Sequence, residues 1–355
     1  MTSLFSVSRW IATVLAAVLL ANTSAYAEDL RVDIDKTFVD EGSGVGFVPS
    51  VGEFVRDKVF RFGSDNDVGA TYEDPDGGTF ATIYVTRVGT PDPYLWFHRV
   101  LGMITKREGF SALMEPGVQP ELFDAPGFDR PSGIRVTYAV RGSKLRSSGL
   151  ALMAYGDRLV KIRVSSPEHD RVALEEVMNR FIAGFALPAP TGNEPLAYMV
   201  GKCGDRLEYA SDATQLEPTG ALGLAAALLA MNETATDPNG ARIPTKVQYC
   251  FDSLTDRGHA IYRPDSSKTG YLLSYNDAGS AVIVGSGGNT VLAQLSAQKS
   301  DFAYGVSHQS PDRTQIFAPF GTLPSPEAAI DAVANSRVIA STDRDKDITM
   351  TSEVD

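Results

Sequence analysis

The stretch 156-GDRLVKIRVSSPEHDRVALEEVMNRFIAGF-185 decides the fold of the first half of the chain. Its first two residues, Gly156 and Asp157, are typical of a tight hairpin turn. Hydrophobic and polar residues then alternate, as in a strand, and further on the hydrophobic residues recur at spacings of three and four, as on one helix face. The stretch therefore predicts a strand followed by an amphipathic helix. The residues expected to be buried are Val160, Ile162 and Val164 in the strand, and Leu174, Val177, Met178, Phe181, Ile182 and Phe185 in the helix.

The segment between this strand and helix, 165-SSPEHD-170, gathers residue types that are also found in hydrolytic triads. A triad needs side chains that converge from separate elements, whereas neighbours on one helical turn point apart. Pro167 suits a first helical turn, and the two acidic residues would face the positive end of the helix dipole. The segment therefore predicts a helix start capped at Ser166, with His169 facing solvent.

Residues 28–187 are predicted to alternate between antiparallel strands and helices. Strands are expected at 80–87, 133–140 and 149–155, and a helix within 90–110. Asp92 is the expected cap of that helix and Gly109 its stop. His98 falls on the polar side of the helix, which predicts an exposed histidine.

This order of elements resembles the PsbP and DcrB group of small α/β sandwich domains. The resemblance covers residues 47–187 and rests on the element order and on the stretch 156–185, which ends in FIAGF. It implies an antiparallel sheet with helices on its faces, and an accessory, binding or assembly role without catalysis in an extracytoplasmic compartment. DcrB-like members often carry a lipid-modified cysteine, and this chain has no cysteine near its predicted cleavage site.

Residues 1–27 are predicted to be a signal peptide. One basic residue, Arg9, precedes the uncharged run 10–22, and the small residues Ala25 and Ala27 stand where a signal peptidase reads them. The run is too short to span a bilayer, which takes roughly 20 residues. We expect cleavage after Ala27 and a periplasmic or secreted mature chain that is not inserted in a membrane; an uncleaved anchor is the alternative.

Length and composition predict two globular domains in an acidic chain. The 355 residues exceed the size at which single cores usually stop growing, and 43% of them are hydrophobic. The net charge of −12 disfavours nucleic acid and anionic membrane surfaces as partners. An unknown protein or a small-molecule ligand is the expected partner.

The chain is predicted to be α+β, with a PsbP/DcrB-like domain at 28–187, a linker at 188–195, a β-rich domain at 196–340 and a flexible acidic tail at 341–355. The linker is rich in proline, and the β-rich domain holds short strands separated by turn residues. Its expected strands are 197–203, 246–251, 259–263, 270–275, 281–284, 290–295 and 314–320, and its expected helices lie within 218–232 and 325–337.

Three patterns in the second half suggest a function but fit a structural role better. The uncharged helix at 218–232 is short for a membrane span and is expected to be a buried core helix. The glycine-rich 285–288 lacks the lysine of a phosphate-binding loop and predicts a hairpin loop. Alternating aspartates at 343–347 begin like a calcium loop, but Ile348 stands where the turn needs glycine.

No cofactor or metal motif is found in the sequence. The four histidines have no metal-binding spacing and neither cysteine has a ligand partner close by. The leading interpretation is therefore a binding or accessory module that is not an enzyme. The alternative is a hydrolase in the second domain, built from His259, Asp256, His308 and Ser307, although no nucleophile-elbow motif accompanies these residues.

Cys203 and Cys250 are the only cysteines. In an exported chain the compartment is oxidising, so we expect a disulfide between them that closes the second domain. Two buried free thiols, or a thiol paired with another chain, are the alternatives.

Overall fold

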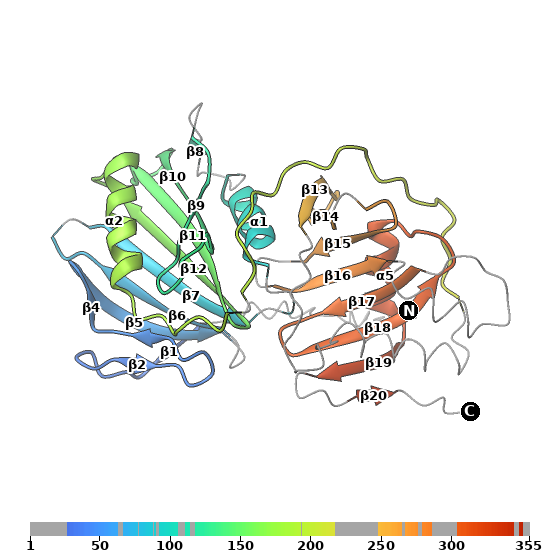
Figure 1. The fold of residues 1–355 in the computed structure, drawn as a ribbon, viewed down its shortest axis with the longest axis horizontal. Helices are drawn as coiled ribbons and strands as arrows, with labels where there is room; N and C mark the ends of the chain where they lie inside the picture. The colour runs from blue at the N-terminus through green and yellow to red at the C-terminus, as the bar shows by residue number, and fades with distance from the viewer. Residues whose placement is uncertain are drawn as a thin grey trace, which may run out of the picture.

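The computed structural model describes residues 27–62, 67–76, 78–87, 89, 92–105, 111–113, 118–192, 194–216, 248–264, 267–275, 279–285, 304–343 and 348–350. The architecture is sheet-rich α+β, with two large antiparallel sheets, a small two-stranded one and three helices among these residues (Figure 1). The small sheet pairs β2 (Phe38–Val39) with β3 (Gly46–Phe47).

The first large sheet has ten strands, with eight along the path β1-β5-β6-β7-β12-β11-β10-β8; β4 also pairs with β5, and β9 with β10. The strands are β1 (Ala27–Leu30), β4 (Ser50–Val51), β5 (Phe54–Phe62), β6 (Asp67–Glu73), β7 (Phe80–Arg87), β8 (Ser111–Leu113), β9 (Glu121–Phe123), β10 (Gly133–Arg141), β11 (Ser147–Tyr155) and β12 (Arg158–Ser166). The four strands predicted between 80 and 164 are all confirmed.

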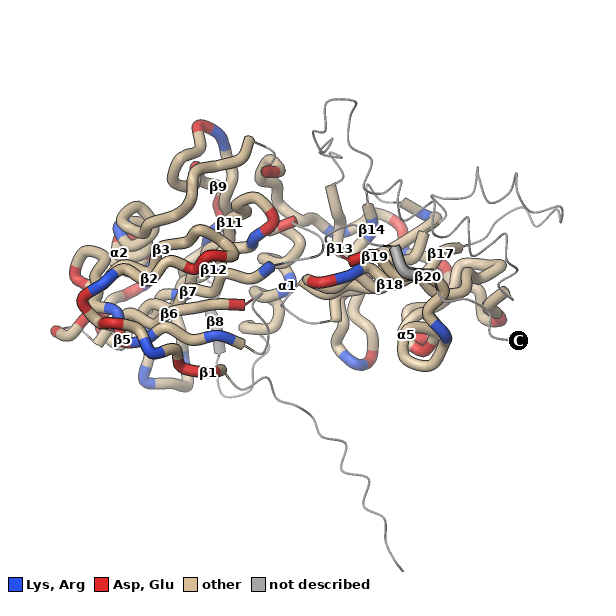
Figure 2. Tube along the Cα trace, turned by 90° about the horizontal axis from the view of Figure 1, so that it is seen from below, with Lys and Arg blue, Asp and Glu red and all other residues tan. Residues whose placement is uncertain are grey.

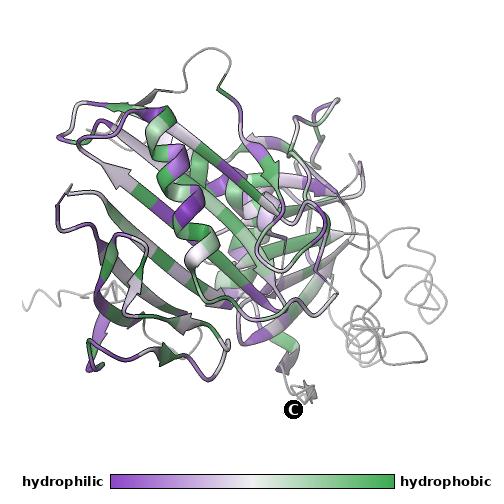
Figure 3. Ribbon diagram, turned by 60° about the vertical axis from the view of Figure 1, so that its left-hand side comes forward, coloured by the Kyte–Doolittle hydropathy of each residue, from purple (hydrophilic) through white to green (hydrophobic). Residues whose placement is uncertain are grey.

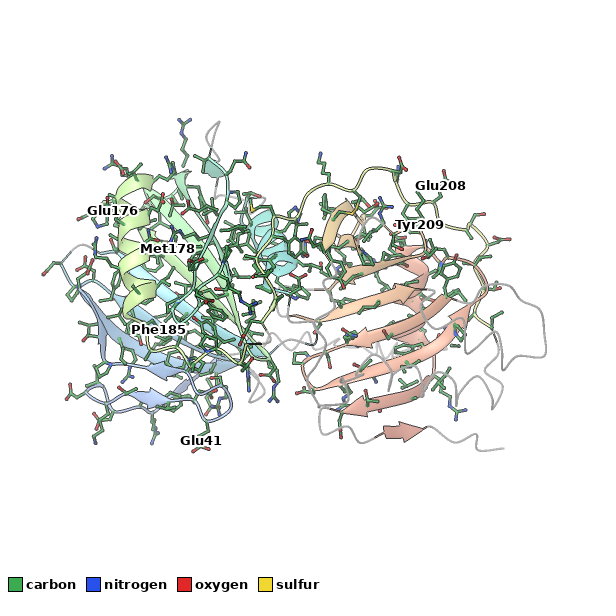
Figure 4. All side chains as sticks on the ribbon, viewed as in Figure 1. Glu41, Glu176, Met178, Phe185, Glu208 and Tyr209 are labelled. Carbon is green, nitrogen blue, oxygen red and sulfur yellow. A yellow bond between two sulfur atoms is a disulfide. The ribbon has the colours of Figure 1, made fainter. Side chains whose placement is uncertain are left out.

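Helix α2 (Arg171–Gly184) covers one face of this sheet, where hydrophobic residues of the strands lie beneath it (Figure 3). Met178 and Phe185 lie on the side toward the sheet, and Glu176 lies on the outer side (Figure 4). The predicted hydrophobic positions of the strand and the helix are all buried in one core: Val160, Ile162, Val164, Leu174, Val177, Met178, Phe181, Ile182 and Phe185.

The predicted start of α2 was wrong by one turn. The N-cap is Asp170, whose carboxylate accepts the backbone N–H of Ala173 at 3.0 Å. Ser166 forms a separate turn before it, in which its Oγ accepts the N–H groups of Glu168 and His169. The helix begins later because Ser166 bonds its own neighbours, so the chain turns before it winds.

The second large sheet has eight strands in consecutive order from β13 to β20, so each strand pairs with the next one in the chain. Its strands are β13 (Tyr249–Leu254), β14 (Ala260–Pro264), β15 (Gly270–Ser274), β16 (Ala281–Gly285), β17 (Tyr304–Gln309), β18 (Arg313–Phe320), β19 (Val338–Asp343) and β20 (Ile348–Met350). Helix α5 (Pro326–Asn335) packs on one face, and its predicted start is confirmed, with Ser325 as N-cap and Glu327 in the first turn.

Two predictions for the second half were wrong. Residues 197–203 form no strand, and only an isolated bridge joins Lys202 to Phe251. A flexible tail was expected from residue 341, but residues 341–343 belong to β19 and residues 348–350 to β20. They are ordered because β19 pairs with β18 as far as Asp343, and β20 pairs with β19. The predicted helix at 218–232, the strand at 290–295 and the loop beyond Gly285 lie outside the described residues.

Helix α1 (Pro93–Thr105) lies between the two large sheets (Figure 1). It packs on β10 and β11 of the first sheet, and the same hydrophobic core continues into the second sheet through Ala260, Tyr262, Leu272 and Ala281. As predicted, Asp92 caps the helix, since its carboxylate accepts the N–H groups of Tyr94 and Leu95. None of the described helices is both long enough and apolar enough to cross a bilayer.

Charged residues of both signs gather on the loops and outer strands around the first sheet (Figure 2). Residues of the predicted linker pack against this sheet, where the Glu194 carboxylate accepts the N–H groups of Gly156, Thr191 and Gly192. Burial alone would raise the pKa of Glu194, but hydrogen bonds from the backbone of Thr191 and Gly156 and from the Thr191 hydroxyl lower it overall. The chain thus stays beside the first sheet at least to Ala197, whose N–H donates to the carbonyl of Pro131, before it crosses to the second.

Candidate functional site

A cleft of about 770 Å³ opens where the first sheet, α1 and the second sheet meet. Its volume lies within the range of about 300–1,000 Å³ that is usual for small-molecule sites. Three groups of residues line it: Tyr84, Leu150, Lys161 and Arg163 from the first sheet; His98, Arg99, Val100, Gly102, Met103 and Ile104 from α1; and Phe251, Leu254, Gly258, Ala260 and Tyr262 from the second sheet and its first turn.

Strand pairing sets the wall that the first sheet provides. Lys161 on β12 pairs with Tyr84 on β7, and its Nζ lies 4.6 Å from the centre of the Tyr84 ring. Arg163, two residues further along the same face, pairs with Leu150 on β11. Because α1 packs on β10 and β11, it leaves this part of the face over β7 and β12 open to the cleft.

His98 joins α1 to the opposite wall. Its Nδ1 and the hydroxyl of Tyr262 share a hydrogen bond of 3.0 Å, and its ring centre lies 4.9 Å from that of Phe251. The prediction of an exposed histidine was wrong, because the polar side of α1 faces the second sheet and not solvent. Burial, followed by the charge of Arg99, lowers the pKa of His98, so the imidazole is neutral at pH 7.

The cleft is cationic although the chain carries a net charge of −12. Arg99, Lys161 and Arg163 line it, and none of the described lining residues is an aspartate or a glutamate. The Nε of Arg99 is buried and has no hydrogen-bond partner among the described residues.

A series of buried hydrogen bonds joins Asp92, at the N-terminal end of α1, to the second sheet. The hydroxyl of Tyr198 donates to the Asp92 carboxylate at 2.7 Å and accepts the N–H of Tyr249 at 2.9 Å. Burial raises the pKa of Asp92, against the lowering by Tyr198, Leu95 and Tyr94. This chain, together with the His98–Tyr262 hydrogen bond and the shared hydrophobic core, holds the two cleft walls together.

The predicted disulfide is formed by Cys203 and Cys250, whose Cα atoms lie 5.0 Å apart. The bridge fixes the incoming segment to β13, and Phe251, the residue after Cys250, is part of the cleft wall. Backbone hydrogen bonds hold the same place, since Phe251 donates to Gly201 and accepts from Cys203.

The residues of the hydrolase alternative do not assemble into a catalytic group. His259 and His308 lie on either side of the Tyr275 ring, with ring centres 5.4 and 5.5 Å from it. Ser307 precedes His308 on β17 and so points to the other face of the sheet. Asp256 lies exposed in the turn between β13 and β14. No described hydrogen bond joins either histidine to Ser307 or Asp256.

Within the described part of the chain, no group of three or more histidine, cysteine, aspartate or glutamate side chains is placed to hold a metal ion. Asp343, the first residue of the calcium-like pattern, ends β19 and pairs with Arg313 in the sheet register. Residues 344–347 of that pattern lie outside the described residues.

Sequence reasoning missed the cleft. Lys161 and Arg163 were assigned only to one face of a predicted strand, and no role was predicted for Arg99. Part of the cleft could have been found from the sequence, since Lys161 and Arg163 share one face of a strand and no acidic residue lies next to either. The opposite wall, however, comes from residues about a hundred positions further along the chain.

No protein-family model, no curated protein and no solved structure matches the chain.

Proposed function

We propose that the protein is an exported binding module that holds a small molecule in the cleft between its two sheets. The observation that carries the proposal is the lining itself, which combines an apolar and aromatic surface with three basic side chains and no acidic one among its described residues. Pockets that bind small molecules are mostly apolar and carry a few polar groups that orient the ligand.

Two further features support the extracytoplasmic setting. The Cys203–Cys250 disulfide fits an oxidising compartment, where paired thiols persist. Cleavage after Ala27 would leave Glu28 as the first residue of the edge strand β1, which pairs with β5. The intact mass of the exported protein is expected to match a chain that starts at Glu28, and a mature chain that still holds residues 10–22 would contradict this.

The proposal includes two domains, divided at residues 188–195, of which the first is a PsbP/DcrB-like sandwich. Helices on both faces of the first sheet, α2 on one and α1 on the other, support that likeness. In this arrangement α1 belongs to the first domain and gives the second domain its docking surface.

A variant that fills the cleft tests the function. A Cβ built at Gly102, a lining residue in the middle of α1, has no neighbour within 4 Å, so Gly102→Phe can enter the cleft without a clash at its base. Gly204→Phe is the matched control, because Gly204 is also unobstructed and lies outside the cleft.

The measurement is native mass spectrometry of protein exported by its own cells, followed by extraction of bound small molecules. We expect a bound species in the wild type and in Gly204→Phe, and at least a ten-fold loss of it in Gly102→Phe at an unchanged melting temperature. Equal occupancy in both variants would place the site elsewhere and refute the proposal.

A further inference from the structure

We infer that the ligand in the cleft is an apolar molecule with a carbonyl oxygen, which accepts a hydrogen bond from the Nε2–H group of His98. This inference rests on the proposed function and adds the chemical class of the ligand. Three features of the cleft carry it: the position of the proton on His98, the space over Gly102 and the apolar lining.

The hydroxyl of Tyr262 fixes the position of the proton on His98. Tyr262 is 0% exposed, and Nδ1 of His98 is the only hydrogen-bond partner of its hydroxyl among the described residues. A buried O–H group without an acceptor is costly, so the hydroxyl donates and Nδ1 accepts. A neutral imidazole whose Nδ1 accepts a hydrogen bond carries its proton on Nε2. Nε2 of His98 is therefore a donor.

This donor is open to the cleft that His98 lines. Nε2 has no hydrogen-bond partner among the described residues, and it is not one of the buried atoms that lack a partner. The Nε of Arg99 differs in this respect, because it is buried and out of reach of a ligand. A ligand in the cleft can therefore replace the solvent at Nε2 of His98.

Gly102 provides room beside the His98 ring. The two residues lie four positions apart and so share one face of α1, and a side chain at 102 would lean toward the turn that holds His98. A Cβ at Gly102 would have no neighbour within 4 Å, so no close packing requires a glycine there. Glycine inside a helix is destabilising, and its effect here is to leave the cleft open next to the imidazole.

The polar group of the ligand has to accept a hydrogen bond without donating one. A hydroxyl could accept from Nε2, but its own proton would then need an acceptor. The basic side chains that line the cleft, Arg99, Lys161 and Arg163, have donors and no acceptors, whatever contacts they make within the protein. A carbonyl oxygen accepts and carries no proton, so it fits this lining better than a hydroxyl does.

The body of the ligand is set by the apolar part of the lining. Met103 and Leu254, from α1 and β13, are 40% and 39% exposed, so the described part of the chain leaves both partly uncovered. The ring of Phe251 lies beside the donor, with its centre 4.9 Å from that of His98 and 5.9 Å from that of Tyr262. Apolar surface that covers these side chains is removed from water on binding, which favours a hydrocarbon ring or chain.

The same proton position disfavours a metal or haem iron at His98. A histidine that coordinates a metal uses a ring nitrogen without a proton and donates from the other nitrogen to an oxygen. Coordination through Nε2 would move the proton to Nδ1, and the buried hydroxyl of Tyr262 would then have no acceptor among the described residues. A hydrogen bond to a carbonyl leaves the His98–Tyr262 pair as it is.

Nitrogen NMR of protein with isotope-labelled histidine tests the position of the proton without any ligand. We expect a protonated Nε2 and an unprotonated Nδ1 for His98 at neutral pH. Tyr262→Phe should weaken this preference, because it removes the donor to Nδ1. The His98 signals are assigned by their loss in His98→Gln. A protonated Nδ1 in the wild type would overturn the inference.

Equilibrium dialysis with two matched pairs of probes tests the ligand class. The pairs are methyl naphthyl ketone with isopropenylnaphthalene, and methyl octyl ketone with the alkene in which a methylidene group replaces its oxygen. They are added to the mature protein after removal of any bound species. In at least one pair we expect the ketone to bind about five-fold more tightly than the alkene, as for one neutral hydrogen bond. The tighter ketone shows whether the body is a ring or a chain.

Variants assign the preference to His98. His98→Phe keeps an aromatic ring and removes the donor, so the ketone and the alkene should bind equally. His98→Gln keeps an N–H donor and should retain part of the preference, which also covers the case that His98→Phe does not fold. His169→Phe is the matched control, since it makes the same change outside the cleft. Melting curves check the folding of each variant.

The outcomes separate this inference from the proposed function. Equal binding of ketone and alkene to the wild type that is lost in Gly102→Phe would leave a binding module and overturn the carbonyl. A preference for the ketone that survives in a folded His98→Phe would also overturn it, as would a natural ligand without a carbonyl oxygen. If no probe binds and the exported protein carries no small molecule, both proposals fail.

Discussion

Arg56 in the first sheet and Arg263 in the second are both buried, but only Arg263 has a buried carboxylate partner. Arg56 on β5 donates to the backbone carbonyls of Phe47, Asp33 and Lys36. Arg263 on β14 forms an ion pair of 2.9 Å with Asp252, and the two side chains are only 1% and 2% exposed. Arg56 thus fixes an N-terminal loop to the first sheet, whereas Arg263 belongs to a charge pair inside the core of the second.

The two sheets also differ in how they are covered and held together. Both faces of the first sheet are covered by helices, and its core on the α2 side holds many buried hydrophobic residues from six of its strands and the loops beside them. Among the described residues, the second sheet has one short helix on its outer face, α5, and a disulfide at its edge strand β13. We infer that stability is spread over many contacts in the first sheet and depends on a few specific bonds in the second.

The largest expected effect comes from breaking the buried ion pair. Arg263→Met leaves the Asp252 carboxylate buried without its partner and is expected to cost about 3–5 kcal/mol in the free energy of unfolding. Arg56→Met removes no charge partner and leaves only carbonyl groups unsatisfied, so about 2 kcal/mol is expected. Urea unfolding of both variants measures the difference.

The double variant Arg263→Met with Asp252→Leu serves as the control. It removes both charges, so it should recover most of the loss, because replacing a buried pair by apolar residues is often neutral. Equal costs for Arg56→Met and Arg263→Met would remove the contrast between the sheets.

The disulfide is expected to have the next largest effect. Cys203→Ser with Cys250→Ser should lower the free energy of unfolding by about 2–4 kcal/mol, because the bridge closes a loop over a sequence separation of 47 in the unfolded chain. Reduction of the wild type under native conditions should give the same loss in a thermal melt. An unchanged melting temperature in both experiments would show that the second sheet does not depend on this bond.

Asp92 tests the junction between the sheets. Asp92→Ala removes the N-cap of α1 and the acceptor of the Tyr198 hydroxyl, so about 1–2 kcal/mol is expected. Asp92→Asn keeps an acceptor oxygen and should cost less. Burial is the largest cause of the raised pKa of Asp92, so the folded state holds this proton more tightly than the unfolded one does.

The sign of the pH dependence follows from that difference. Between the unfolded pKa near 3.8 and the higher folded pKa, the Asp92 contribution to stability falls as the pH rises. Asp92→Asn should remove this slope, which urea midpoints measured at several pH values can detect. A wild-type and an Asp92→Asn curve that stay parallel across acidic pH would contradict the raised pKa.

The sequence predicted four strands of the first sheet, β7, β10, β11 and β12, because their signal is local. In 80–87, Ala81, Ile83 and Val85 alternate with more polar residues, and all three are buried. In the second sheet, β17 and β19 were missed since 304-YGVSHQ-309 and 338-VIASTD-343 carry few hydrophobic residues and depend on pairing with β18. The His98 environment was also missed, because the surface that covers it belongs to the second sheet.

The cleft was missed for the same reason, because it depends on contacts between distant parts of the chain. Its basic residues lie on elements that were predicted, yet their convergence depends on how α1 sits between the sheets. The Asp92–Tyr198–Tyr249 chain that holds this arrangement links residues more than a hundred positions apart. Contacts between residues so far apart in the chain cannot be predicted from one stretch of sequence. The helix cap at Asp92, in contrast, depends on neighbouring residues and was predicted.

The smallest expected effect concerns the turn before α2. His169 contributes its backbone there, since its N–H donates to Ser166 and its carbonyl accepts the Ser147 hydroxyl at 2.7 Å. His169→Ala keeps both bonds and should change the free energy of unfolding by only a few tenths of a kcal/mol, as for a surface residue. Pro167→Gly should cost more, because it gives the unfolded chain more freedom.

Ser166→Ala is the matched comparison in the same turn. Ser166 is buried, its Oγ accepts two backbone N–H groups, and it shares a hydrogen bond of 2.8 Å with Thr79. Its loss leaves these groups unsatisfied and should cost about 1–2 kcal/mol, several times the cost of His169→Ala. Urea unfolding ranks the two. A His169→Ala variant that is as unstable as Ser166→Ala would show that the imidazole itself supports the turn, and a variant that melts normally but no longer binds its ligand would give this histidine a role in binding.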